Sequence, residues 1–222
     1  MMDNPPPSYY EYLIPQNDSS FIKQTAFALM DQLEGWCSHE KATTLMRLVL
    51  QKRAEVIVEI GVFGGKSLIP MAYAQKIMGI GKTYGIDPWD ANASLQGLQD
   101  PANRQWWGSV NHGKILENLQ AKIRIFGLDA QIELIKATSS DAQPIDKIDL
   151  LHIDGNHSES ASFFDVLKWV PLVKQGGVIV FDDLHWYENG INTTARAVEW
   201  LNANCIRFEA EKSSEWGIWI KP

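Results

Sequence analysis

Short apolar runs alternate with amphipathic stretches along most of this chain of 222 residues. Each run is rich in β-branched residues; the runs span 54–60, 83–87, 131–136, 148–153 and 178–182. The stretches between and after them carry apolar residues three or four apart, at 66–78, 112–126, 158–173 and 192–204. Strands that alternate with helices in this way are typical of a parallel sheet with helices on both faces. The pattern therefore predicts an α/β fold.

Both ends of the chain depart from this alternation. Before the first strand, Ser19 and Ser20 precede a helical pattern that reaches Leu33, and Ser38 caps a second helix. After the last helix, the strand-like stretches 206–211 and 216–220 are separated by only four residues. So short a link predicts a hairpin, because a parallel crossover needs about a dozen residues. The last strand should therefore run antiparallel to the rest of the sheet.

One structural unit with three parts is expected from these patterns. A flexible, proline-rich lead covers 1–18, a helical cap covers 19–53, and the α/β domain covers 54–222. Within that domain, the stretch 88–111 is an irregular insert rich in Asn, Asp, Gln and Trp. The cap could also form the interface of a homodimer.

The composition excludes several classes of protein. The net charge is −7, which argues against a sequence-independent grip on nucleic acid, since that needs a basic surface. The chain contains no run of about 18 apolar residues, so no membrane span is predicted. The first residues lack the apolar core of a signal peptide. Two cysteines form no disulfide framework, which favours the cytoplasm. The partner is expected to be a small molecule.

A glycine-rich turn follows the first strand, in the sequence Val-Ile-Val-Glu-Ile-Gly-Val-Phe-Gly-Gly-Lys-Ser at 56–67. Glycines let the backbone approach a ligand closely, and the helix that follows offers free N–H groups to an anion. The final Gly-Gly-Lys-Ser also invites a comparison with phosphate-binding P-loops. Ile60 stands where that pattern needs a glycine, which argues against the P-loop alternative.

Acidic residues mark the ends of successive strands, namely Glu59, Asp87, Asp154, Asp182 and Asp183. Ligands of open α/β sheets bind along that edge. A carboxylate at Asp87 can accept the hydroxyls of a ribose. The last three acids come from neighbouring strand ends and together could bind Mg²⁺ or Mn²⁺. The alternative is that these acids cap helices or that lysines relieve their repulsion.

His157 lies three residues after Asp154 and is placed to face the same crevice. Its imidazole could take a proton from a bound hydroxyl, or it could simply cap the helix 158–173. His185 is a second candidate for contact with substrate or metal. Trp residues at 106–107 and 186 either line an acceptor pocket or pack long loops.

The order of these features resembles the class I S-adenosylmethionine-dependent methyltransferases. Val-Glu-Ile-Gly-Val-Phe-Gly-Gly-Lys-Ser looks like their first motif and Gly-Ile-Asp-Pro-Trp like their ribose-binding motif. Leu-Leu-His-Ile-Asp-Gly-Asn-His and Gly-Gly-Val-Ile-Val-Phe-Asp-Asp look like the motifs of the fourth and fifth strands. The chain looks most like a small bacterial branch with the Ile-Asp-Gly-Asn-His run, and is more distantly similar to catechol and macrolide-sugar O-methyltransferases. The resemblance implies a Rossmann-like sheet in the order 3-2-1-4-5-7-6.

The resemblance also implies a cofactor site for S-adenosylmethionine. The residues that would form it are Glu59, Gly61 and Gly65 at the methionine, Ser67 at its carboxylate, Asp87 at the ribose, Trp89 beside the adenine, Ser139 or Ser140 at the adenine edge, Asp154, and Trp36 in the segment that closes over the cofactor. Asp154, Asp182 and Asp183 match the metal ligands of the metal-dependent branches, and His157 falls where the catechol enzymes place a lysine base.

The function expected from the sequence is methyl transfer to a hydroxyl of a sugar, polyol or phenol, assisted by a divalent ion and a histidine base. Three alternatives stay open. A carboxylate acceptor would need no base, the domain could bind the cofactor without catalysis, and a P-loop protein would bind ATP instead.

Overall fold

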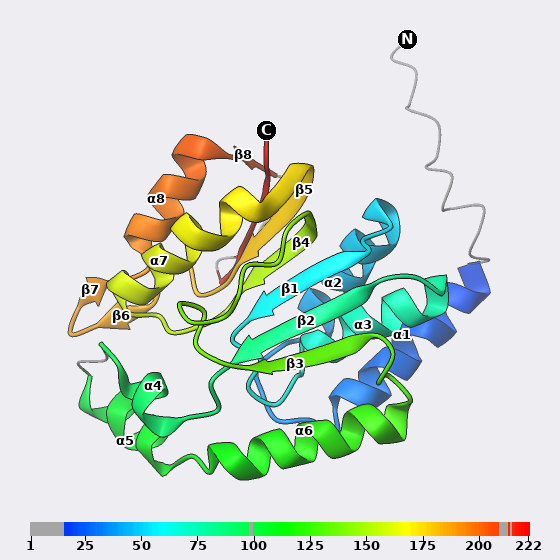
Figure 1. The fold of residues 1–222 in the computed structure, drawn as a ribbon, viewed down its shortest axis with the longest axis horizontal. Coiled ribbons are helices and arrows are strands. Elements are labelled where there is room, and N and C mark those ends of the chain that lie inside the picture. The colour runs from blue at the N-terminus through cyan, green and yellow to red at the C-terminus, as the bar shows by residue number, and fades with distance from the viewer. Residues whose placement is uncertain (1–15, 98–99, 209–212, 214) are drawn as a thin grey trace.

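A computed structural model describes residues 16–97, 100–208, 213 and 215–222 of the protein. Its centre is a seven-stranded sheet in the order β3-β2-β1-β4-β5-β9-β8. The strands are β1 (Val56–Ile60), β2 (Lys82–Asp87), β3 (Ile132–Lys136), β4 (Ile148–Ile153), β5 (Val173–Phe181), β8 (Ile206–Arg207) and β9 (Gly217–Ile220). β1 to β5 are parallel, and β9 pairs antiparallel with both β5 and β8. The predicted strand order and the antiparallel last strand are confirmed (Figure 1).

Helices cover both faces of the sheet (Figure 1). One face packs against α1 (Gln16–Met30), α2 (His39–Lys52), α3 (Leu68–Met78) and α6 (His112–Phe126), and the other against α7 (Glu159–Trp169) and α8 (Ala195–Asn204). Alternate residues of β1 show why: Ile57 packs with the α1–α2–α3 side and Val58 with the α7–α8 side. A strand buried on both faces is therefore apolar throughout, which is the pattern that predicted it.

The two N-terminal helices lie over β1, β4 and β5. Ala26 and Met30 of α1 and Leu45 and Val49 of α2 are buried in the same cluster as Leu150. The Ser38 side chain accepts a hydrogen bond from the Lys41 N–H, so the predicted cap is present. The cap predicted at 19–53 thus packs on the sheet, although α1 begins three residues earlier and its helix ends at Met30 rather than Leu33. The predicted lead at 1–18 falls largely outside the described residues.

Two local predictions were wrong. Gly176 and Gly177 do not form a turn before the fifth strand but lie inside β5, where pairing with β4 is shifted between Ile148 and Leu150. A strand irregularity of this kind accepts glycines that would otherwise signal a turn. The insert at 88–111 is also not irregular. It contains α4 (Ala91–Leu95) and α5 (Pro101–Ser109), each capped by an aspartate, Asp90 and Asp100.

A second insertion follows β5. Its strands β6 (Tyr187–Glu188) and β7 (Ile191–Asn192) form a small hairpin that the sequence did not predict. The last predicted strands are shorter than expected, and residues 209–211 of the stretch 206–211 lie outside the described residues. Among the described residues, no helix has the length and apolarity needed to cross a membrane.

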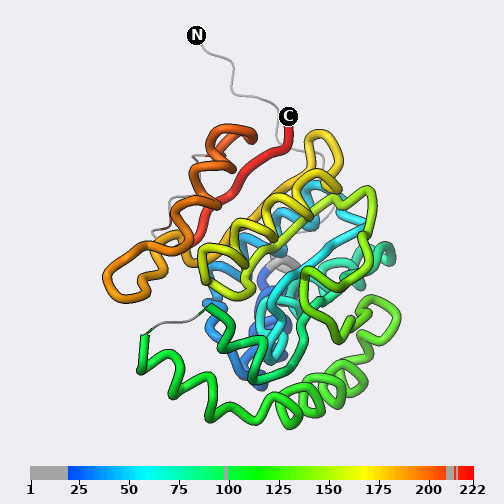
Figure 2. Tube along the Cα trace, turned by 60° about the vertical axis from the view of Figure 1, so that its left-hand side comes forward, coloured from blue at the N-terminus to red at the C-terminus, as the bar shows by residue number. Residues whose placement is uncertain are grey.

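The two insertions meet beyond the carboxyl ends of the parallel strands, where Figures 1 and 2 show α4 and α5 beside the β6–β7 hairpin. Glu188 joins them. Its carboxylate accepts hydrogen bonds from the Asp100 N–H at 2.6 Å, from the Asn103 side chain at 2.8 Å and from the Trp186 indole at 2.8 Å. Because Glu188 is buried, these contacts are shielded from water and fix one insertion against the other.

Candidate active site

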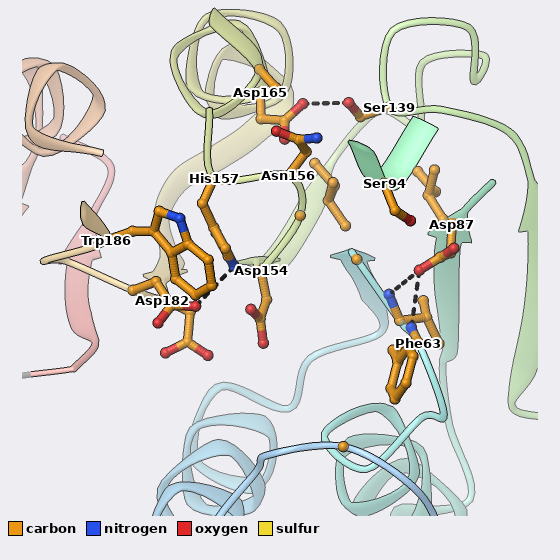
Figure 3. A pocket seen from close by; sticks show the side chains of 18 of the residues that line it. Phe63, Asp87, Ser94, Ser139, Asp154, Asn156, His157, Asp165, Asp182 and Trp186 are labelled. Carbon is orange, nitrogen blue, oxygen red and sulfur yellow. Dashed lines mark hydrogen bonds and ion pairs between the residues drawn. The ribbon is translucent and has the colours of Figure 1, made fainter. Parts of the chain in front are cut away.

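A cavity of about 880 Å³ opens at the carboxyl ends of the parallel strands, below these two insertions. Figure 3 shows side chains from β2, from α7 and from the residues directly after β4 and β5 pointing into it. Of the predicted site residues, all but Glu59, Gly65, Trp89 and His185 line this cavity: Trp36, Gly61, Ser67, Asp87, Ser139, Ser140, Asp154, His157, Asp182 and Asp183. The sheet edge therefore brings together most of the residues that the sequence assigned to one site.

Asp87 fixes the glycine-rich turn after β1. Its carboxylate accepts the N–H groups of Val62 at 3.0 Å, Phe63 at 2.9 Å and Trp89 at 2.7 Å (Figure 3). Burial raises the pKa of Asp87, although these three bonds to the carboxylate oppose the rise. A carboxylate has about four acceptor positions, so about one remains for a ligand. The Asp87 carboxylate can therefore accept about one further hydrogen bond from a group in the cavity.

Two glycines of the turn allow close approaches that no other residue could make. Gly61 has a φ of +82°, and a Cβ there would lie 1.9 Å from the carbonyl oxygen of Asp154. Gly65, with a φ of +83°, would place a Cβ 2.5 Å from Leu119 of α6. Gly61 thus borders the cavity where β1 and β4 end side by side, whereas Gly65 serves the packing of α6 beneath the turn.

Glu59 is fully buried and does not line the cavity. Its Oε1 accepts a hydrogen bond from the Ser67 hydroxyl and lies 2.8 Å from Nδ1 of His152. Burial raises the pKa of Glu59 to about 8 and lowers that of His152 to about 3. Ser67, predicted to hold a methionine carboxylate, lines the cavity while its hydroxyl is engaged with Glu59. Glu59 thus meets the cavity wall through Ser67, while its Oε2 has no hydrogen-bond partner among the described residues.

The loop after β3 carries Ser139 and Ser140 to the other end of the cavity. The Ser139 hydroxyl donates to the carboxylate of Asp165, which α7 presents to the same cavity (Figure 3). Burial raises the pKa of Asp165 to about 7. Lys168 holds the loop in place by donating to the carbonyl oxygens of Ser139 and Ser140, at 2.8 and 2.9 Å. Asp165 is a site residue that the sequence did not reveal.

Aromatic side chains form the wall nearest the turn. Trp36 is 69% exposed and stacks on Phe63 with ring centroids 5.3 Å apart. The Trp106 ring meets the Trp36 ring edge-on, with centroids 5.1 Å apart. Trp89 is placed differently from the prediction. Only 4% of it is exposed, and its indole donates to the Phe63 carbonyl at 2.9 Å, so it packs beneath the turn instead of flanking an adenine. Cys37 borders the cavity, but burial raises the pKa of its thiol to about 12, which leaves it unreactive.

His157 and Asp183 form a hydrogen-bonded pair across the cavity. The His157 Nε2 lies 3.0 Å from the Asp183 Oδ2, and the ring packs against Trp186 with centroids 4.4 Å apart. Burial alone would lower the pKa of His157, but the hydrogen bond and the charge of Asp183 outweigh it and raise the pKa above 6.5. Burial would raise the pKa of Asp183, yet His157 lowers it below 3.8. Such a pair can accept a proton from a bound hydroxyl and stabilise the resulting imidazolium.

Asp154 and Asp182 face a lysine that the sequence analysis did not single out. The Lys41 ammonium contacts the Asp182 Oδ2 and lies 3.5 Å from the Asp154 Oδ2. Only 6% of the Lys41 side chain is exposed. The clue was available in the sequence, because Lys41 lies one turn before Leu45 and two before Leu48, on the apolar face of its helix.

The donor atoms for a divalent ion are present in two overlapping groups, His152, Asp154 and Asp182, and Asp154, His157 and Asp183. The two carboxylates in each group suit Mg²⁺ or Mn²⁺ in type, whereas the imidazole is a softer donor than Mg²⁺ prefers; within each group the donor atoms lie within 4.8 Å of one another. In each group, however, one carboxylate is already bonded to a side chain that can carry a positive charge. Lys41 contacts Asp182 in the first, and His157 bonds to Asp183 in the second. The residues as arranged do not fit a divalent ion, which would have to displace one of these contacts.

Comparison with known proteins agrees with the fold. A family model described as a methyltransferase domain matches residues 58–184, which is more than half of the chain. The sheet order and the closing hairpin define a Rossmann-like α/β protein, and the chain belongs to the methyltransferase-domain family.

Solved structures share the fold at low sequence identity. A protein from Klebsiella pneumoniae, provisionally assigned as an O-methyltransferase, superposes with a TM-score of 0.62 at 13% identity, over 96% of this chain and 95% of that one. An O-methyltransferase from Bacillus cereus, solved with S-adenosylhomocysteine, gives a TM-score of 0.58 at 16% identity over 96% of both chains. An uncharacterized protein of Acanthamoeba polyphaga mimivirus is 27% identical over 175 residues, 79% of this chain and 70% of that protein.

Proposed function

We propose that this protein transfers the methyl group of S-adenosylmethionine to a hydroxyl oxygen of a small molecule. The observation that carries the proposal is the His157–Asp183 pair, which lines the same cavity as the Gly61 turn and Asp87. A cofactor held at the turn and an acceptor held at the pair would then share one cavity. Family membership supports the methyl transfer, and the basic pair supports a hydroxyl acceptor, because a carboxylate would need no base.

Catalysis would come chiefly from holding the two reactants close and aligned. The acceptor oxygen attacks the methyl carbon, the carbon–sulfur bond breaks with its electron pair remaining on sulfur, and the hydroxyl proton passes to the His157–Asp183 pair. Asp87 and the Gly61 turn hold the cofactor, and Ser139, Ser140 and Asp165 lie at the end of the cavity left for its adenine. The divalent ion that the resemblance implied takes no part in this proposal.

The test begins with S-adenosylhomocysteine binding by calorimetry. Transfer of a tritiated methyl group from S-adenosylmethionine is then measured with three acceptor panels, namely sugars, phenols and carboxylic acids. His157→Gln should retain binding and lose transfer to the hydroxyl panels. Transfer only to carboxylic acids, unaffected by His157→Gln, would establish the ester-forming alternative. Binding without transfer to any panel or cell extract would favour a non-catalytic domain, and no binding would refute the proposal.

The proposal also includes three predictions from the sequence. These are a cytoplasmic location, the absence of a nucleic-acid or membrane partner, and a homodimer through the N-terminal helices. They rest on composition and on the position of α1 and α2, and size-exclusion chromatography with light scattering would test the dimer.

A further inference from the structure

A buried ammonium lies at the centre of the acidic cluster. Lys41 reaches from α2 to the ends of β4 and β5, where it contacts Asp182 and lies 3.5 Å from Asp154. A lysine that is 6% exposed needs charge compensation, and two carboxylates supply it. The carboxylates in turn need the ammonium, because two neighbouring carboxylates repel each other unless a cation lies between them.

The position of Lys41 follows from the helix that carries it. The Ser38 cap begins α2 just before Lys41, and Ala42, Leu45 and Val49 bury the same helix against the sheet. The side chain of Lys41 therefore leaves a fixed backbone and projects along the buried face into the cavity, which it lines. An exposed lysine would swing between partners, whereas this one is held at the carboxylates by the packing around its stem.

A divalent ion at Asp154 and Asp182 would compete directly with this ammonium. Both would need the Asp182 Oδ2, and the ion would lie next to the positive charge of a side chain that is almost entirely buried. The remaining donors offer no separate site, since Asp154 is common to both groups and the Asp183 Oδ2 is bonded to His157.

We infer that Lys41 takes the place of a divalent ion in this cavity, so that the carboxylate cluster is balanced by an ammonium and methyl transfer proceeds without a metal. The second half of the inference rests on the proposed function. As the proton of the acceptor hydroxyl leaves for the His157–Asp183 pair, the ammonium supplies the positive charge beside the developing alkoxide, which is the role a metal ion would have had.

The experiment measures binding of Mn²⁺ alone by electron paramagnetic resonance, which separates free from bound ion. Three proteins are compared: the wild type, Lys41→Met, which removes the ammonium and keeps the length of the stem, and Lys66→Met, which removes a positive charge from another part of the cavity wall. The wild type and Lys66→Met should leave Mn²⁺ free. Lys41→Met should bind one ion per chain at least about tenfold more tightly, because the carboxylates are then uncompensated.

Two results would overturn the inference. One is a wild-type protein that binds one Mn²⁺ per chain and loses it in Asp182→Asn. The other is a Lys41→Met variant that is folded by circular dichroism and binds no more Mn²⁺ than the wild type. S-adenosylhomocysteine binding, measured separately on the wild type, tests the proposed function. Failure there would leave the inference about the charge of the cluster standing.

Once an acceptor is known, turnover after treatment with EDTA completes the test. Wild-type activity should be unchanged, and a loss that added Mg²⁺ restores would contradict the inference.

Discussion

The His157 Nε2 lies 3.0 Å from the Asp183 Oδ2, and each residue shifts the pKa of the other. Because the His157 pKa is raised above 6.5, the ring is protonated at mildly acidic pH and cannot act as a base. It becomes neutral, and able to accept a proton from the substrate, only as the pH rises past that pKa. The value of kcat/KM for methyl transfer should therefore increase with pH through a midpoint above 6.5. Asp183→Asn removes the charge that raises the pKa and should move the midpoint to lower pH, while His157→Ala should lower kcat by about 10²–10⁴-fold. A profile that is flat in the wild type, or unchanged in Asp183→Asn, would exclude His157 as the base.

Asp87 should matter both to the cofactor and to the fold. Asp87→Asn weakens the three hydrogen bonds that hold the turn, and we expect the free energy of unfolding to fall by about 1–3 kcal/mol. Loss of a charge-assisted contact to the ribose should weaken S-adenosylhomocysteine binding by at least about tenfold. Asp129→Asn, at an exposed position, is the matched control and should change neither quantity. Unchanged affinity in Asp87→Asn would show that the carboxylate serves the turn alone.

Glu59 should impose a pH dependence on stability. Burial raises its pKa from 4.5 to about 8, so the folded protein keeps a proton that the unfolded chain releases. The stability that this proton contributes is fully present below pH 4.5 and is lost as the pH rises to about 8. Since glutamine does not titrate, the difference in free energy of unfolding between wild type and Glu59→Gln should decrease over that window and level off above it. Glu133→Gln, on the exposed side of β3, controls for the loss of one carboxylate. A difference that stays constant with pH would mean that Glu59 is ionised in the folded protein.

Alanine substitutions at Gly61 and Gly176 can separate two effects on stability, that of backbone conformation and that of close approach to a neighbouring strand. Both have a positive φ, +82° and +71°, but a Cβ would meet the Asp154 carbonyl only at Gly61 and nothing within 4 Å at Gly176. Gly176→Ala should therefore cost about 1–2 kcal/mol, from conformation alone. Gly61→Ala should cost clearly more, or prevent folding, because β1 and β4 must separate at the cavity. Urea denaturation of both variants tests this, and equal losses would show that the strand ends adapt to the added methyl group.

The sheet could be predicted almost completely from the sequence, because buried parallel strands are apolar along their whole length and the four-residue link after 211 leaves only a hairpin. Gly176 and Gly177 misled the prediction because a glycine pair signals a turn only when no neighbouring strand supplies hydrogen bonds, and here Lys221, directly after β9, accepts from the Gly176 N–H and donates to the Gly177 carbonyl. The β6–β7 hairpin was invisible for a related reason. Each of its strands has two residues, too few for any periodicity.

The site could be predicted only as a set of positions. Strand ends place Asp87, Asp154, Asp182 and Asp183 at one edge, and the cavity contains them all. Sequence position says nothing about which way a side chain turns, so Trp89 was assigned to a ligand and instead lies under the turn. Lys41 was missed because its partners are 113 and 141 residues away, a pairing that no local pattern encodes.

Glu188 links the two insertions above the cavity, so that neither can be exchanged without affecting the other. It ties the hairpin after β5 to Asp100 and Asn103 of the insert after β2, two segments that are 85 to 88 residues apart in the chain and together roof the cavity. Replacing either segment alone with one from a relative would remove a set of contacts that neither segment can make by itself. The two insertions are therefore a single structural unit, and a chimaera that exchanges both should fold where one that exchanges only one does not.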